Sequence, residues 1–325
     1  MMRPTRWAAA LLAALLTGLA TSALAQAWPD KPVKLLLSQP AGSGPDVVAR
    51  IIGERLGTKW GQGVVIDNRP GGQNVVGAQA AARSPADGYT YYFATTAALV
   101  TNAFLLKSLP YDPQKDFTPV AFIGKSPFAI LVPTASPIKS IDDFVAKAKA
   151  EPGKWTLANE GPKTFSGMIA RLFAARTKTE LNLIPYVNVG VAVQNTLGGH
   201  TDAVVADIAS TAQLVKQGQL RMLAVTSAQR VQGFESVPPL ADTLPGFDMV
   251  GWFAIVAPTG TPAAAIQRFS RDLDAVLRDK DVAERIHAAG PVTEGAGTPE
   301  QLGAFLKAEH ERWTAVTKEI GILPE

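Results

Sequence analysis

Short apolar runs alternate along this chain with segments in which apolar residues recur every three or four positions. The first pattern is typical of buried strands and the second of helices that cover a sheet. The expected strands are residues 33–38, 64–66, 89–94, 128–132, 155–158, 183–186, 203–206, 222–226 and 252–257. The expected helices are residues 45–56, 75–82, 140–150, 164–175, 208–217, 261–278 and 298–318, with another that ends at 197. This alternation predicts an α/β protein with a parallel, doubly wound sheet.

The strand–helix pattern stops and restarts near residue 125. Residues 125–249 would form a second domain inside the chain, and residues 26–124 and 250–325 would form the first domain together. The chain would then cross between the domains twice, which makes a hinge. In open α/β folds a ligand binds in a crevice at the carboxyl ends of the strands. We therefore expect two domains, each a sheet flanked by helices, with a ligand cleft between them.

The N-terminal segment has the pattern of an export signal. Arg3 and Arg6 precede an apolar run over residues 7–20, and small residues follow around Ala25 and Ala27. This order of charged, apolar and small residues is typical of a secretory signal peptide. The apolar run is shorter than the ~20 residues that span a bilayer, which disfavours a membrane anchor. We expect cleavage near Ala25 or Ala27 and an exported, soluble mature protein.

Composition excludes several classes of protein. The chain has 325 residues, no cysteine and a formal charge of +3, from 31 basic and 28 acidic residues. Without cysteine there is no disulfide scaffold and no thiolate metal site. Two of the basic residues leave with the signal, so 29 basic residues face 28 acidic ones in the mature chain. A nearly neutral chain without a basic cluster is not expected to bind nucleic acid.

The sequence lacks the residue spacings that are typical of enzyme active sites and metal sites. His200, His287 and His310 have no neighbour at metal-ligand spacing, and no Gly-x-Ser-x-Gly elbow occurs. We therefore expect no catalytic residue, no metal and no cofactor.

Short motifs occur in order along the whole mature chain. They are WPDKPV at 28–33, PAG at 40–42, DNRPGG at 67–72, PADGYT at 85–90, LPYD at 109–112, DFTPV at 116–120, PY at 185–186, LAVT at 223–226 and APTGTP at 257–262. This ordered set resembles the Bug-type family of extracytoplasmic solute receptors, the binding proteins of tripartite tricarboxylate transporters. The resemblance implies a type II-like periplasmic-binding-protein fold that closes on a small organic, amino or aromatic acid. It also implies a periplasmic location and a membrane transporter as partner, and we expect a monomer.

The loop after the first strand is the strongest candidate for the ligand site. Gly42, Ser43 and Gly44 allow backbone N–H groups to face a ligand, and the next helix directs its N-terminus to the same place. The alternative is a plain strand-to-helix turn in which Ser43 caps the helix. Asp46 pairs with Arg50 on the same helix face by its spacing, and the family resemblance places it at the ligand loop.

A second loop, residues 159–164, supplies further candidates. Asn159, Gly161 and Thr164 stand where the family has a loop rich in serine and glycine, while Lys163 departs from that pattern. Thr164 is expected to cap the following helix and to donate to a ligand carboxylate. Lys163 either adds positive charge to the site or is a solvated loop lysine.

Two more places complete the predicted site. Tyr186 matches the family motif, and Asn188 either caps the next helix or bonds the ligand. Asp207 follows a strand, where its carboxylate suits an amine or hydroxyl of the ligand or else caps the next helix. Phe93, Phe165 and Trp252 are either apolar walls of the site or core residues.

Two other functions stay open on the residues alone. One is a receptor that presents its ligand to a signalling partner instead of a transporter. The other is a secreted α/β hydrolase, which needs a nucleophile–base pair that the sequence does not show.

Overall fold

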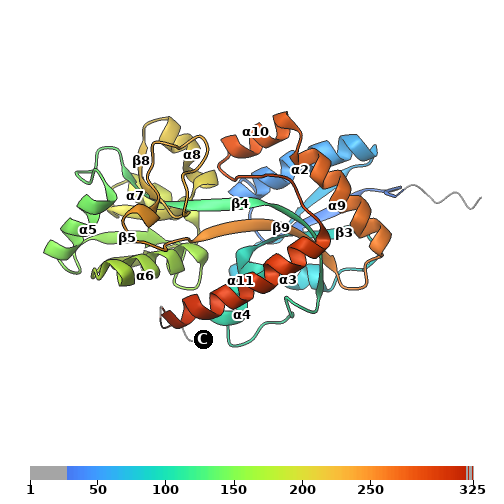
Figure 1. The fold of residues 1–325 in the computed structure, drawn as a ribbon, viewed down its shortest axis with the longest axis horizontal. Helices are drawn as coiled ribbons and strands as arrows, with labels where there is room; N and C mark the ends of the chain where they lie inside the picture. Colours follow the sequence, from blue (N-terminus) through green and yellow to red (C-terminus); the bar gives the residue numbers. More distant parts are fainter. Residues whose placement is uncertain (1–27, 320, 322–323, 325) are drawn as a thin grey trace, which may run out of the picture.

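The computed structural model describes residues 28–319, 321 and 324. The expected signal peptide, residues 1–25, and both expected cleavage points lie outside the described residues. Figure 1 shows an elongated molecule with two groups of helices and strands. We call them the first group, which holds β1–β3 with α2, α3, α9 and α10, and the second group, which holds β5–β8 with α5–α8.

The strands join in one mixed sheet with the order β2-β1-β3-β9-β4-β7-β5-β6, and β8 also pairs with β4. Their bounds are β1 Val33–Leu37, β2 Val64–Asn68, β3 Thr90–Thr95, β4 Phe117–Pro133, β5 Thr156–Asn159, β6 Asn182–Pro185, β7 Ala203–Asp207, β8 Leu220–Val225 and β9 Val250–Pro258. All of the strands expected from the apolar runs are present. The first part of β4, which contains Pro119, was missed.

The helices cover both faces of this sheet. They are α2 Gly44–Trp60, α3 Val75–Ala82, α4 Asn102–Leu105, α5 Ile141–Ala150, α6 Phe165–Thr177, α7 Val189–Leu197, α8 Ile208–Lys216, α9 Ala263–Leu277, α10 Lys280–Ala288 and α11 Pro299–Glu319. Short helical turns lie at η1 Gly72–Asn74, η2 Ala97–Thr101 and η3 Leu240–Asp242. No helix of the described residues is long and apolar enough to cross a bilayer.

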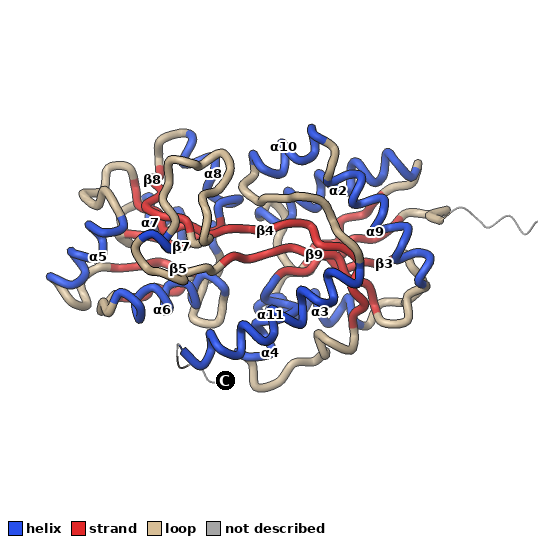
Figure 2. The backbone as a smooth tube through the Cα atoms, in the orientation of Figure 1, coloured by secondary structure: helices blue, strands red, loops and turns tan. Residues whose placement is uncertain are grey.

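The expectation of a wholly parallel sheet is wrong. β1 runs parallel to β2 and β3, and β5 runs parallel to β6 and β7, but β4 and β9 are antiparallel to their neighbours. The reason is the way in which the chain passes between the two groups. β4 leaves the first group and β9 returns to it, so the two strands run side by side in opposite directions (Figure 2).

β4 and β9 are long enough to belong to both groups. Residues 117–127 of β4 pair with β9, and residues 128–133 of the same strand pair with β7 and β8 in the second group. Register shifts near Pro119 and Phe122 bend β4, and a bulge is where a strand tolerates proline. The crossing near residue 125 is therefore a continuous pair of strands.

The apolar core has separate parts and a shared part. One buried cluster belongs to the first group and the ends of β4 and β9, and a second lies around β7, β8 and α8. A third cluster extends across both groups and includes Trp252, Phe165 and Trp313. Trp313 lies on α11, the helix that runs from the first group towards α6 (Figure 1). This helix is therefore a further connection between the groups, beside the two strands.

Candidate functional site

Asp46 organises the loop that follows β1. Its Oδ2 accepts hydrogen bonds from the Gly42 N–H at 2.8 Å and from Arg50 Nε at 2.9 Å. Its Oδ1 accepts from Asn68 Nδ2 at 2.9 Å. Burial by itself would raise the pKa of Asp46, but the hydrogen bonds from Arg50, Gly42 and Asn68 together hold the pKa below its usual value. The predicted pairing with Arg50 is confirmed, and Asp46 ties β1, β2 and α2 together at one point.

Replacing Asp46 by asparagine should lower the free energy of unfolding by about 1–3 kcal/mol near pH 7, because a buried charged acceptor is lost. Since the folded-state pKa of Asp46 is depressed, its contribution is fully present above the unfolded-state value of ~3.9 and disappears as the pH falls through the folded-state value. Urea unfolding of both proteins at a series of pH values measures this. A difference that stays constant down to the lowest pH would contradict the assigned role.

Ser43 lies at the N-cap position of α2 but does not cap the helix. Its Oγ donates to the carbonyl of Pro40 at 2.7 Å, and its N–H donates to the same carbonyl at 3.3 Å. The interpretation of Ser43 as a side-chain cap is therefore wrong. The Gly42 and Ser43 N–H groups are already used inside the loop, and Pro45 has no N–H. The helix start therefore leaves over the N–H groups of Gly44 and Asp46.

Gly44 is the point where the two groups meet. A Cβ atom at Gly44 would lie 2.6 Å from Ala209 Cβ and 3.0 Å from Asp207 Oδ1, both in the second group. Gly290 makes a similar approach, with a Cβ position 2.7 Å from the Ala209 N atom. Glycine is thus required sterically at residue 44, and the N-termini of α2 and α8 face each other across this contact.

The second predicted loop folds back on itself. Thr164 Oγ1 accepts from the Gly167 N–H at 3.2 Å, so its predicted cap of α6 is confirmed. The same hydroxyl donates to the Gly161 carbonyl at 2.8 Å, so its hydrogen is already engaged. Asn159 is buried and accepts the Gly161 N–H at 2.8 Å. Lys163 is half-buried on this loop and has an interaction within the protein, and its role in the ligand site stays a prediction.

The remaining predicted residues border the same edge of the sheet. Asn188 caps α7 through the Val191 N–H at 2.9 Å, and Asp207 caps α8 through the Ser210 N–H at 2.8 Å. Tyr186 is half-buried and packs against the core of the second group. The predicted caps by Asn188 and Asp207 are confirmed. A ligand role for these two residues and for Tyr186 stays a prediction.

Glu160 also lies at this edge of the sheet, and the sequence did not indicate it as a candidate site residue. It directly follows β5, and its carboxylate accepts the N–H of Val189 and lies 3.4 Å from Ser166 Oγ. Withdrawal from water and the nearby charge of Asp207 raise the pKa of Glu160 to about 7. Burial also raises the pKa of Asp207, against the opposing effect of its bonds to Ser210. The one signal in the sequence was the place of Glu160 directly after a strand.

The candidate aromatic walls are core residues. Phe93, Phe165 and Trp252 are all below 9% exposed. Trp252 donates from Nε1 to Glu309 Oε2 at 2.8 Å, and Phe165 stacks edge-on against Trp313. The core interpretation is confirmed.

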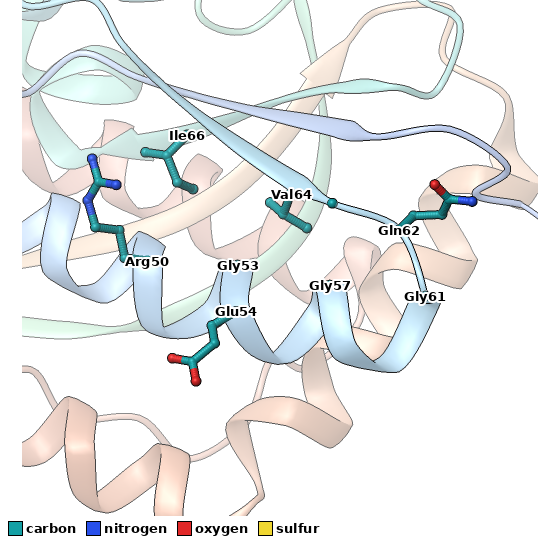
Figure 3. Close-up of a pocket in the computed structure, with 9 residues that line it drawn as sticks. Arg50, Gly53, Glu54, Gly57, Gly61, Gln62, Val64 and Ile66 are labelled. Carbon is teal, nitrogen blue, oxygen red and sulfur yellow. The ribbon is translucent and has the colours of Figure 1, made fainter.

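An open hollow of about 640 Å³ lies elsewhere, along α2 and β2 (Figure 3). Arg50 and Glu54 point away from each other there, and four glycines line the wall. None of the predicted ligand residues lines it, and its charged groups do not converge on one point. The hollow is therefore a poor candidate for a ligand site compared with the meeting point of α2 and α8.

The sequence model of a protein family, described as "Tripartite tricarboxylate transporter family receptor", matches residues 48–322 of this chain. The chain belongs to this receptor family. Protein BugT of Bordetella pertussis is a family relative that is 33% identical over 306 residues, which is 94% of this chain and 94% of BugT.

Solved structures of the family share the fold. An R. palustris protein solved with adipate is 30% identical, has a TM-score of 0.86 and covers 92% of this receptor and 100% of its own chain. The periplasmic binding protein BugD is 26% identical, with a TM-score of 0.83 over 92% of this receptor and 100% of BugD. The expected Bug-type resemblance and the expected fold class are therefore confirmed.

Proposed function

We propose that this receptor captures a small carboxylate between its two groups of elements and delivers it to a tripartite tricarboxylate membrane transporter. The observation that supports this most directly is the convergence at Gly44. The start of α2 in the first group meets the start of α8 in the second group. Glu160, whose pKa the charge of Asp207 raises, contacts the first residues of α6 and α7 through Ser166 and Val189. Helix N-termini carry unpaired N–H groups and favour anions. The adipate bound to the R. palustris relative supports a carboxylate as the ligand class.

The two groups would act as two domains, residues 26–124 with 250–325 and residues 125–249. The separate apolar clusters of the groups support this division, and β4 with β9 would form the hinge. Closing of the domains around a ligand would be the change that the membrane partner reads. The predicted ligand residues are Gly42, Ser43, Gly44, Asp46, Asn159, Gly161, Lys163, Thr164, Tyr186, Asn188 and Asp207.

The location and the absence of catalysis complete the proposal. The relatives include a periplasmic binding protein, and the expected signal peptide would bring this chain to the same compartment. The role is binding without turnover, in line with the receptor family to which the chain belongs. The protein would act as a monomer.

A thermal-shift screen of carboxylates on the mature protein tests this function. A ligand that binds the folded state alone stabilises it by RT ln(1 + [L]/Kd), which is ~2.7 kcal/mol at 100 times Kd. We expect at least one carboxylate to raise the melting temperature and to be recovered unchanged. A melting temperature raised by sugars or metal ions but by no carboxylate would refute the proposal, and so would turnover of the ligand.

A further inference from the structure

The segment between α10 and α11, residues 289–296, lies where the two groups meet, and we call it the strap. It leaves the end of α10 and runs back along β4 to the start of α11 (Figure 2). Its far end is fixed to the first group. There the carbonyl of Ala296 accepts the N–H of Phe122 at 3.0 Å, and the N–H of Ala296 donates to Asp274 Oδ1 at 2.9 Å. The strap is therefore anchored to the first group at this end.

The middle of the strap is paired with the crossing strand β4. The N–H of Lys125 donates to the carbonyl of Val292 at 2.9 Å, and the N–H of Val292 donates to the carbonyl of Lys125 at 2.8 Å. A Cβ atom on Gly124 would lie 2.5 Å from the carbonyl oxygen of Val292, so a side chain there would push the strap away. Lys125 lies close to the point where β4 passes from residues 117–127 to residues 128–133, and thus from one group to the other. The strap therefore follows the crossing itself.

The strap also contacts the second group, along helix α8. A Cβ atom on Gly290 would lie 2.7 Å from the N atom of Ala209, at the start of α8. The side chain of Val292 packs against the buried cluster around β7, β8 and α8. In the last turn of α8, Lys216 Nζ donates to the carbonyl of Ala288 at 3.4 Å, directly before the strap. The strap thus connects the first group to both ends of α8.

Ala209 lies between two glycines of the first group. Its Cβ faces Gly44 at the start of α2, where an added Cβ would lie only 2.6 Å away, and its backbone N faces Gly290 of the strap. Both neighbours lack a side chain, and neither contact has room for one more methyl group. Contacts packed this closely do not deform continuously, so such an interface has discrete arrangements. The start of α8 is therefore either seated between Gly44 and Gly290 or clear of them.

We propose that the strap and Gly44 form a catch that holds the start of α8 and thereby sets how much of the receptor is closed. This inference rests on the proposed function, which needs the two groups to close, and it names the contact that regulates the closing. Because the strap pairs with β4 at Lys125, bending of the crossing strands moves Gly290 relative to Ala209. The apparent Kd for a ligand of the closed form is the intrinsic Kd divided by the closed fraction. The catch therefore tunes ligand affinity through residues of the strap that need not touch the ligand.

The separation of the two groups can be measured directly, because the chain has no cysteine that would compete for a label. Spin labels on Gln217→Cys, directly after α8, and Lys280→Cys, at the start of α10, report this separation, and both positions are exposed. We expect the ligand-free mature protein to show a population with a short separation. Ala209→Leu should remove about half or more of that population, because the larger side chain does not fit against Gly44. Ala264→Leu makes the same change at an exposed position at the start of α9 and should keep the wild-type distribution.

A second variant assigns the effect to the strap. Val292→Ala removes apolar contact between the strap and the second group and should also reduce the share of the short separation. Val65→Ala, on the exposed face of β2, is its control. The melting temperature of ligand-free Ala209→Leu should stay within about 2 °C of the wild type, because opening of the groups relieves the overlap. A lower melting temperature with an unchanged separation would show permanent packing instead of a catch. Unchanged separations in Ala209→Leu and Val292→Ala would overturn the proposal as well.

Binding measurements separate this proposal from the function on which it rests. Adipate, succinate and glutamate are titrated into the wild type and Ala209→Leu by calorimetry, and each one that binds should bind the variant about fivefold or more weakly. Equal affinities would overturn the catch and leave the carboxylate function standing. A changed separation in Ala209→Leu, with no carboxylate that binds in the thermal-shift screen, would refute the carboxylate function and support the catch.

Discussion

Gly44→Ala is expected to weaken ligand binding by about tenfold or more, with little change in the stability of the ligand-free protein. The added Cβ would lie 2.6 Å from Ala209 Cβ, which is closer than real Cβ atoms approach, and 3.0 Å from Asp207 Oδ1, which would have to shift. Overpacking of this kind costs about 1–3 kcal/mol, and 1.4 kcal/mol is a factor of ten in affinity. In the proposed hinge motion, opening of the two groups would relieve the overlap, so the cost would fall on the closed, ligand-bound form.

Gly190→Ala is the matched control for this change. Gly190 also lies at the start of a helix in the second group, but the nearest atom to its Cβ position is Asn188 Oδ1 at 3.4 Å. Calorimetry with a bound carboxylate should show near wild-type affinity for this variant. Wild-type affinity of Gly44→Ala would show that the contact between α2 and α8 is not part of the ligand-bound state.

Trp313→Ala should lower the free energy of unfolding by about 3–5 kcal/mol, as large-to-small changes of buried aromatic residues do. Trp313 is fully buried on α11, and its ring lies 5.6 Å from that of Phe165 at the start of α6. The substitution leaves a cavity where the C-terminal helix packs against the second group. Because α11 also bonds β9 through Glu309 and Trp252, loss of this packing weakens a connection that both groups share.

Urea or thermal unfolding measures the effect, and Glu311→Ala is its control. Glu311 is exposed on the same helix, and surface substitutions usually change stability by less than about 0.5 kcal/mol. Equal unfolding midpoints for Trp313→Ala and Glu311→Ala would show that α11 contributes no packing energy at this point.

Local features of the sequence predicted most of the elements correctly. Strand and helix patterns depend on the spacing of apolar residues, and caps depend on residues at fixed short distances, so both can be recognised without the fold. The Asp46–Arg50 pair and the caps by Thr164, Asn188 and Asp207 were found in this way. The pattern misled at Ser43, because its hydroxyl has a nearer acceptor in the Pro40 carbonyl.

The crossing strands show where local reasoning ends. Pro119 and Gly124 interrupt the apolar pattern of β4, so the sequence predicted only residues 128–132 as a strand. In the structure β4 continues through register shifts because β9 pairs with it along the whole crossing. Strand direction was missed for the same reason, since it depends on which distant strand becomes the neighbour.

The site itself divides in the same way. The sequence by itself determined the fold class and the family, and it predicted the loops of the proposed ligand site, because each depends on short motifs in a fixed order. Only the tertiary structure decided that Gly44 packs against Asp207 and that the charge of Asp207 acts on Glu160. Gly44 and Asp207 are more than a hundred positions apart along the chain, and they meet only because the two groups pack against each other in the folded protein. The physical cause is that charge and close packing act over a few ångströms in space, whatever the distance along the chain.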